Sequence, residues 1–206
     1  MRFYLLIILI SLTATSFSQK DSSFYRDEFF HFWEEQDAHF MSKELSPLPK
    51  KMRRNFHGHQ HFNFSMNYVV TAYLERIENS DTIIMKTSAD TEKKYVYFAR
   101  VHFRLHETSC SLYVYQSLSL REIEEYKNHL FIPFRDATSG NETYGAGRYI
   151  DLLIPNSDSI VINFNHAYNP YCAYTDGYFC PIPPKENTLK IEISAGAKVP
   201  LESTKH

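Results

Sequence analysis

The sequence predicts a mainly β fold: an antiparallel sheet forming a barrel- or sandwich-like domain, with one N-terminal amphipathic helix. Segments of alternating apolar and polar residues predict the strands, and aromatic residues, which strands favour, make up 16% of the chain. Glycine is scarce, with 6 among 206 residues, which disfavours a chain made of flexible loops. This length and a hydrophobic content of 43% suit one domain with a single core.

The first residues have the pattern of an export signal. Arg2 precedes an uncharged apolar run over 3–12, and small residues lead to a predicted cleavage after Ser18. We therefore expect a signal peptide at 1–18 and a single domain at 19–206. The apolar run is shorter than the roughly 20 residues that span a membrane. The expected product is a soluble protein in the periplasm or outside the cell.

An amphipathic helix is expected from Ser22 to Lys43. Asp21 is a favourable residue for starting a helix, and aromatic side chains recur at helical spacing behind it. Two prolines then end the helix. The basic cluster at 50–54 is short and isolated, so it predicts a solvated turn. With a net charge of −2, the chain offers no surface for nucleic acid.

Strand signals dominate the rest of the chain. Between Phe98 and Val101 the apolar alternation changes parity, which predicts a β-bulge or a strand buried on both faces. A short surface helix is expected at 118–126. The predicted strands are 67–76, 82–87, 94–105, 110–116, 130–134, 148–155, 159–165 and 188–194.

Three cysteines would meet an oxidising compartment after export, where disulfides persist. Cys172 and Cys180 enclose a short loop and are the candidate disulfide. Cys110 lies in an alternating apolar stretch, and we interpret it as a small buried hydrophobe.

Three histidines are candidate metal ligands. His57, His59 and His61 alternate along the chain, which on a strand would place three imidazoles on one face as Zn or Cu ligands. Imidazoles stacked in a turn beside neighbouring phenylalanines explain the same pattern without a metal. No metal or other cofactor is therefore assigned from the sequence.

Polar residues and glycines concentrate in two loops, 134–149 and 163–187. The first loop holds half of the chain's 6 glycines, which allow close approach to a ligand or a tight turn. Asp136 and Arg148 form either a pair that fixes this loop or a substrate clamp. We expect a site for a small polar ligand here. Its candidate contacts are Asp136, Thr143, Tyr144, Arg148, Asn165, Tyr168 and Asn169.

The same loops admit two other interpretations. A hydrolase-type enzyme would use Cys172 or a loop hydroxyl near Ser139 as nucleophile, with His166 or Asp136 as the base. Backbone amides at 145–147 would then stabilise the oxyanion. Alternatively, both loops only define the fold.

Four runs of residues in these loops form a recognisable set. They are FRDATSG at 134–140, TYGAGRY at 143–149, FNHAYNPYCAY at 164–174 and CPIPPKEN at 180–187. Together they resemble the signature of domain-of-unknown-function family 1684, an uncharacterised bacterial family. The resemblance implies a mostly β fold and no settled biochemical activity.

The resemblance also marks two departures. Asn163 stands where members of that family commonly carry Asp, and Ala197 stands where they commonly carry Glu. If those carboxylates act chemically, this chain has lost part of the activity. The resemblance further implies that family members without an export signal keep cysteines matching Cys172 and Cys180, which weakens the disulfide interpretation and favours a shared thiol-based or packed site.

Overall fold

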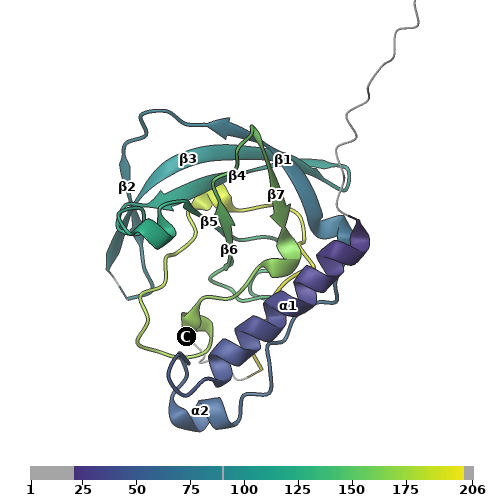
Figure 1. The fold of residues 1–206 in the computed structure, drawn as a ribbon, viewed down its shortest axis with the longest axis vertical. Helices are drawn as coiled ribbons and strands as arrows, with labels where there is room; N and C mark the ends of the chain where they lie inside the picture. The colour runs from purple at the N-terminus through teal and green to yellow at the C-terminus, as the bar shows by residue number, and fades with distance from the viewer. Residues whose placement is uncertain (1–20, 90, 202–206) are drawn as a thin grey trace, which may run out of the picture.

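Seven strands form one curled antiparallel sheet, which confirms the predicted mainly β fold (Figure 1). In this computed structural model the described residues are 21–89 and 91–201. The predicted signal peptide at 1–18 lies outside them. Among the described residues, no helix is long and apolar enough to cross a membrane.

Neighbouring strands pair antiparallel throughout the sheet. Their order is β6-β5-β4-β3-β1-β7, and β2 pairs separately with β3. Each of these strands corresponds to a predicted one, with its ends shifted. The strands are β1 Val69–Arg76, β2 Thr82–Lys86, β3 Glu92–Leu105, β4 Thr108–Ser117, β5 His129–Phe134, β6 Arg148–Leu153 and β7 Ser159–Asn163.

The predicted strand at 188–194 is wrong. These residues run in an irregular conformation, with one isolated bridge to the sheet at Thr188. Their alternation reflects burial. Leu189 and Ile193 belong to the main core, which is the buried apolar cluster formed largely by strands β1 and β3 to β7. The Ile193 carbonyl accepts a hydrogen bond from the Arg148 guanidinium at 2.9 Å, not from a neighbouring strand. Alternating burial therefore arose here without a strand ladder.

A β-bulge at Phe98 separates apolar clusters on the two faces of the sheet. The pairing of β3 with β4 shifts register between Tyr97 and Ala99, which confirms the predicted bulge. Phe98 and Ala99 both enter the main core, together with Val101. Tyr95 and Tyr97, which precede the bulge, belong to the cluster on the other face. One long strand thus contributes to both clusters.

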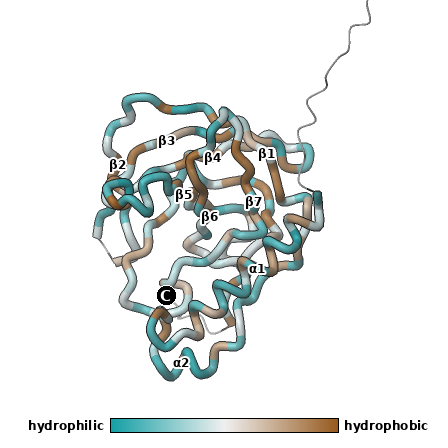
Figure 2. The backbone as a smooth tube through the Cα atoms, viewed as in Figure 1, coloured by the Kyte–Doolittle hydropathy of each residue, from teal (hydrophilic) through white to brown (hydrophobic). Residues whose placement is uncertain are grey.

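We call the cluster on this other face the tyrosine cluster. Segment 168–181 lies against it: Tyr168 packs on the cluster and bridges Tyr149, and Pro181 pairs with Thr87 just after β2. Figure 2 shows the most hydrophobic stretches along the strands, whereas the short helix α2, Lys50–Arg54, is largely hydrophilic. The buried members of the tyrosine cluster are Met85, Tyr95, Tyr115, Phe131 and Tyr149.

The long helix α1, Ser22–Met41, packs against the 3-10 turn that follows β7 (Figure 1). The Asp21 carboxylate caps it by accepting a hydrogen bond from the Phe24 N–H at 3.0 Å. The helix buries Phe29, Trp33 and Phe40. The predicted amphipathic helix is therefore confirmed, although it ends before the expected Lys43.

Three smaller features differ from the expectations. The basic cluster forms a short helix, α2 Lys50–Arg54, at one end of the molecule's longest axis (Figure 1). Lysine and arginine are good helix formers, and a proline directly precedes them. The expected surface helix at 118–126 consists of turns with a single 3-10 turn, Glu124–Tyr126. Cys110 is half-buried at the edge of the main core.

Candidate functional site

Arg148 and Asp136 form an ion pair in the interior of the domain. Arg148 Nη2 lies 2.8 Å from Asp136 Oδ2, and both side chains are 0% exposed. The guanidinium also donates to the carbonyls of Ile193 at 2.9 Å, Ala197 at 3.2 Å and Ala195. Burial lowers the pKa of Arg148, and the Asp136 carboxylate opposes that shift. The pair therefore ties the C-terminal segment to β6 and is closed to a ligand.

The same carboxylate holds the loop after β5. Asp136 Oδ1 accepts hydrogen bonds from the Thr138 N–H at 2.8 Å, the Thr138 hydroxyl at 2.6 Å and the Ile193 N–H at 3.2 Å. The hydroxyls of Thr138 and Thr143 lie 2.9 Å apart, and both residues are buried. The structure therefore gives Asp136, Thr143 and Arg148 structural partners and does not support their predicted role as ligand contacts.

Gly147 lets β6 begin close against this loop. Its φ is +102°, and a Cβ atom there would lie 2.5 Å from the Phe134 carbonyl oxygen. The Gly147 N–H donates to the Tyr144 carbonyl at 3.0 Å, and the Ser139 hydroxyl accepts from the Asp136 N–H at 3.1 Å. The Gly147 amide and the Ser139 hydroxyl, two groups that the hydrolase interpretation needs, are thus engaged within the loop.

Asn165 joins two segments that are far apart in the chain. Its side chain accepts from the Ser65 N–H at 3.0 Å and donates to the Ser65 carbonyl at 2.9 Å, as a strand neighbour would. Its own carbonyl accepts from Trp33 Nε1 at 3.2 Å. The residue is 0% exposed. Asn165 therefore supports the fold, and a ligand cannot reach it.

His166 is a largely buried imidazole beside Asn163. Asn163 Oδ1 accepts from Asn165 Nδ2 at 2.9 Å, so the Asn163 Nδ2 group is the one that faces His166 Nε2, at 3.2 Å. A donor in this place requires Nε2 to be the acceptor. Burial lowers the pKa of His166 to about 4, so the ring is uncharged at neutral pH. The ring also stacks on Phe32, with centroids 4.6 Å apart.

A disulfide joins Cys172 to Cys180, whose Cα atoms lie 6.3 Å apart. The Cys172 sulfur is 3.0 Å from the Ser88 hydroxyl, whereas His166 is engaged with Asn163. A disulfide sulfur is not a thiolate nucleophile. The structure therefore does not assemble the Cys172 and His166 pair that a thiol-based hydrolase needs.

The three alternating histidines have separate surroundings. His59 Nδ1 lies 2.6 Å from Asp37 Oδ1 in α1, and His61 stacks on Trp33 with centroids 4.8 Å apart. His57 is exposed. Burial raises the pKa of Asp37, but its hydrogen bonds from His59 outweigh that effect and lower it overall. Among the described residues, no three His, Cys, Asp or Glu side chains are grouped to hold a metal ion.

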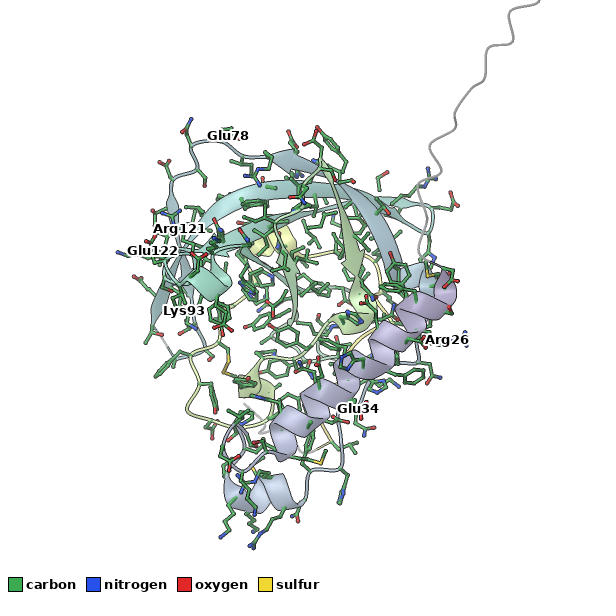
Figure 3. All side chains as sticks on the ribbon, viewed as in Figure 1. Arg26, Glu34, Glu78, Lys93, Arg121 and Glu122 are labelled. Atoms are coloured by element: carbon green, nitrogen blue, oxygen red, sulfur yellow. A yellow bond between two sulfur atoms is a disulfide. The ribbon has the colours of Figure 1, made fainter. Side chains whose placement is uncertain are left out.

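A cleft lies between the tyrosine cluster and segment 168–181, and we call it the aromatic cleft. Its volume is about 480 Å³, within the range of small-molecule sites. Lys93, labelled in Figure 3, and His129 contribute polar groups to its lining. Its aromatic lining comprises Tyr95, Phe131, Tyr149, Tyr168, Tyr171, Tyr178 and Phe179.

A smaller space, the polar cavity, adjoins the aromatic cleft beside α1. Its volume is about 290 Å³, and its walls include Gln36, His59, Asp151, His166 and Asn169. Asn169 is 3% exposed, and its Nδ2 group donates to a backbone carbonyl at 2.8 Å. Its Oδ1 atom is buried without a hydrogen-bond partner among the described residues. This atom is buried as deeply as the Asp136 and Arg148 groups, so Asn169 contributes to the wall of the cavity and offers it no open acceptor.

Asp151 stands where the two spaces meet, and it lines both together with Tyr168 and Tyr171. Its carboxylate accepts from the Tyr168 hydroxyl at 2.6 Å and lies 2.9 Å from His129 Nε2. Burial, with a further contribution from Asp151, raises the pKa of Tyr168 well above its ordinary value. Tyr168 therefore remains a protonated donor, and the half-exposed Asp151 presents a carboxylate at the junction.

The structure brings together only part of the predicted ligand-contact set. Tyr168 and Asn169 line the paired spaces, whereas Tyr144 packs beside Tyr174 in a separate cluster at the end of α1. The sequence reasoning missed Asp151 and Gln36. The available signal for Asp151 was a single carboxylate within an otherwise apolar stretch of β6.

The two positions expected to depart from the family pattern, Asn163 and Ala197, are both buried near α1. Ala197 is 0% exposed and lies in an apolar cluster with Phe29 and Trp33. Asn163 is 8% exposed and contacts His166. A carboxylate at either position would be largely removed from water.

Comparison with known proteins identifies a family without an established activity. Residues 54–198 match the family described as "Protein of unknown function (DUF1684)". The solution NMR structure of an uncharacterized protein from Haloarcula marismortui is 31% identical, with a TM-score of 0.68, and the match covers 88% of this chain and 98% of that one. No match was found among curated proteins. The chain therefore belongs to the DUF1684 family of proteins of unknown function.

Proposed function

We propose that the protein binds a small molecule across the aromatic cleft and the polar cavity. The observation that carries this proposal is that the two spaces adjoin and share Asp151, Tyr168 and Tyr171. One ligand can place an apolar ring against the tyrosines and its polar end in the smaller cavity. The sequence predicted a ligand site in the loops between Asp136 and Asn187. Within that range we now assign the site to segment 168–181 and the adjoining sheet, and not to the buried ion pair.

The polar cavity favours a ligand end that donates hydrogen bonds. Asp151 supplies a half-exposed carboxylate. His166, with a pKa of about 4, adds no positive charge at neutral pH. An amine or a hydroxyl group suits these surroundings, whereas a ligand carboxylate would be repelled by Asp151.

Replacing Asp151 with asparagine should weaken the binding of an aromatic amine about tenfold or more, because a charge-assisted hydrogen bond is lost. Tryptamine is a suitable probe, and phenyl glucoside is its uncharged counterpart. Indole-3-acetate reverses the charge at the polar end. A ligand of the native state raises the melting temperature, so thermal shift followed by calorimetric titration measures each affinity.

Asp158→Asn is the matched control, since it makes the same charge change at an exposed residue just before β7. It should leave the affinities unchanged. Equal binding of tryptamine and indole-3-acetate, or tryptamine binding that Asp151→Asn does not alter, would contradict the proposed polarity of the site. Failure of all three probes to bind would count against the site itself.

We also propose that the protein works outside the cytoplasm, as a soluble domain. The export pattern at 1–18 supports this location, and so does the disulfide between Cys172 and Cys180, which an oxidising compartment maintains. Cys180 lines the aromatic cleft, and the disulfide closes a local loop within segment 168–181, which forms one wall of that cleft.

The exported protein should begin at Gln19 and weigh two hydrogens less than its fully reduced form, as intact-mass spectrometry can measure. Reduction should lower the free energy of unfolding by about 2.5 kcal/mol, because a short closed loop is released. Cys110→Ser should leave both results unchanged. A chain that begins at Met1, or three cysteines that alkylate without reductant, would contradict the proposal.

A further inference from the structure

Basic side chains gather at the end of the molecule that carries α2. They are Lys43, Lys50, Lys51, Arg53 and Arg54, and we call this region, residues 41–54, the basic tip. Figure 1 places α2 at one extremity of the long axis, and Figure 3 shows nitrogen-ended side chains projecting from it. The chain as a whole has a net charge of −2, so this positive charge is a local feature.

Five basic residues and one acidic residue, Glu44, lie within the basic tip, which leaves it with an excess of positive charge. None of its five basic residues forms an ion pair within 21–89 and 91–201. Arg53 Nη1 donates to the Lys43 carbonyl at 3.3 Å, which links α2 to the end of α1. Four of the five, all but Lys51, line a groove of about 700 Å³ together with Met41 and Phe56.

Apolar side chains are exposed at the same tip. Met41 at the end of α1 is 50% exposed, and Leu45 in the following turn is 66% exposed. Leu201, which is 84% exposed, lines a neighbouring cavity together with Met52 and Phe56. Neither Met41 nor Leu45 belongs to any of the buried clusters. Within the described residues, these two apolar side chains therefore remain largely exposed to solvent.

We propose that the basic tip docks on an anionic lipid surface. The lysines and arginines would contact lipid phosphates, while Leu45 and Met41 would enter the headgroup layer. Exposed apolar side chains combined with unpaired cations are characteristic of segments that bind at a membrane interface without crossing it. Each cation near an anionic leaflet contributes about 1 kcal/mol. The basic cluster at 50–54, which the sequence predicted to be a solvated turn, would thus bind anionic lipid phosphates.

Co-sedimentation with vesicles tests the docking. The purified exported protein should bind vesicles of phosphatidylcholine mixed with phosphatidylglycerol, and should bind vesicles of phosphatidylcholine alone far more weakly. Added salt should weaken the binding, because exposed charges are screened.

Neutralising the exposed cations should abolish most of the binding. The variant Lys43→Gln/Lys50→Gln/Lys51→Gln/Arg54→Gln should lose on the order of 100-fold or more in affinity for the anionic vesicles. Leu45→Ser should lose several-fold while keeping the salt dependence. All five side chains are exposed, so circular dichroism should show unchanged folding.

The matched control makes the same charge change elsewhere on the surface. Lys86, Lys94, Lys185 and Lys190 are exposed and distant in sequence from the tip. Changing these four to glutamine should leave vesicle binding within about twofold. If the control loses as much binding as the tip variant, only net charge matters and the proposal is wrong.

Other outcomes would also overturn the proposal. Equal binding to neutral and anionic vesicles would exclude the charged tip as the determinant. Retention of binding by the four-site tip variant would do the same. Binding of inorganic pyrophosphate or a DNA duplex without binding to anionic vesicles would identify a soluble anion as the partner instead.

Discussion

Replacing Arg148 with methionine should lower the free energy of unfolding by about 3–5 kcal/mol, or prevent folding altogether. The change leaves the Asp136 carboxylate buried without its cation. It also removes the donors to the carbonyls of Ile193 and Ala197, and these carbonyls cannot reach water. Urea denaturation followed by circular dichroism measures the loss.

A surface pair provides the control for this prediction. Arg104 Nη2 lies 2.6 Å from Glu107 Oε2, with the arginine side chain 66% exposed. Arg104→Met should therefore change the stability by no more than about 0.5 kcal/mol. A second variant, Asp136→Asn/Arg148→Met, should remain destabilised, because removing the carboxylate charge does not restore the donors to the C-terminal carbonyls. An Arg148→Met protein of normal stability that has lost ligand binding would restore the substrate-clamp interpretation.

The fold was largely predictable because each strand of this sheet carries its own local signal. Alternation reports which side chains of a strand face a core, and the change of parity at Phe98 reports the bulge. The same signal failed at 188–194 because alternation reports burial and does not specify a hydrogen-bond partner. That segment makes backbone hydrogen bonds with Arg135 and Ala137, which lie outside any strand, and its Ile193 carbonyl pairs with the Arg148 side chain.

The candidate site was less predictable because its walls come from distant parts of the chain. Gln36 lies on α1, Asp151 on β6, and Asn169 in the segment that follows β7. No local pattern shows that these side chains converge. The polar loop at 134–149 was recognised correctly as unusual, but composition does not distinguish polar groups that bond within the protein from polar groups that face a ligand. Asp136 and Arg148 belong to the first kind.

Acidification should destabilise the protein by about 3 kcal/mol between pH 6.5 and 4 through His166 alone. Its pKa is about 4 in the folded protein and 6.5 when unperturbed, because burial disfavours the charged ring. In that window the unfolded chain binds a proton that the folded chain does not. Stability is therefore retained above pH 6.5 and is lost as the pH falls toward 4. Urea midpoints measured across this range give the slope.

Two variants separate His166 from other acid-sensitive groups. His166→Gln should flatten the slope in this window, leaving the smaller contribution from Asp37, whose lowered pKa acts in the same direction. Asn163→Asp should reduce the slope for a different reason. Asn163 Nδ2 faces His166 Nε2 at 3.2 Å, and a carboxylate oxygen there would stabilise the protonated ring and raise its pKa.

The Asn163→Asp variant also introduces the residue that the resemblance to the family predicts at this position. If it keeps the steep acid transition of the parent protein, the contact between Asn163 and His166 does not control protonation. If it removes the transition, Asn163 is the reason that this chain holds an uncharged histidine beside the polar cavity. An uncharged His166 adds no positive charge to the polar cavity, so the Asp151 carboxylate can accept a hydrogen bond from a donor group of the ligand.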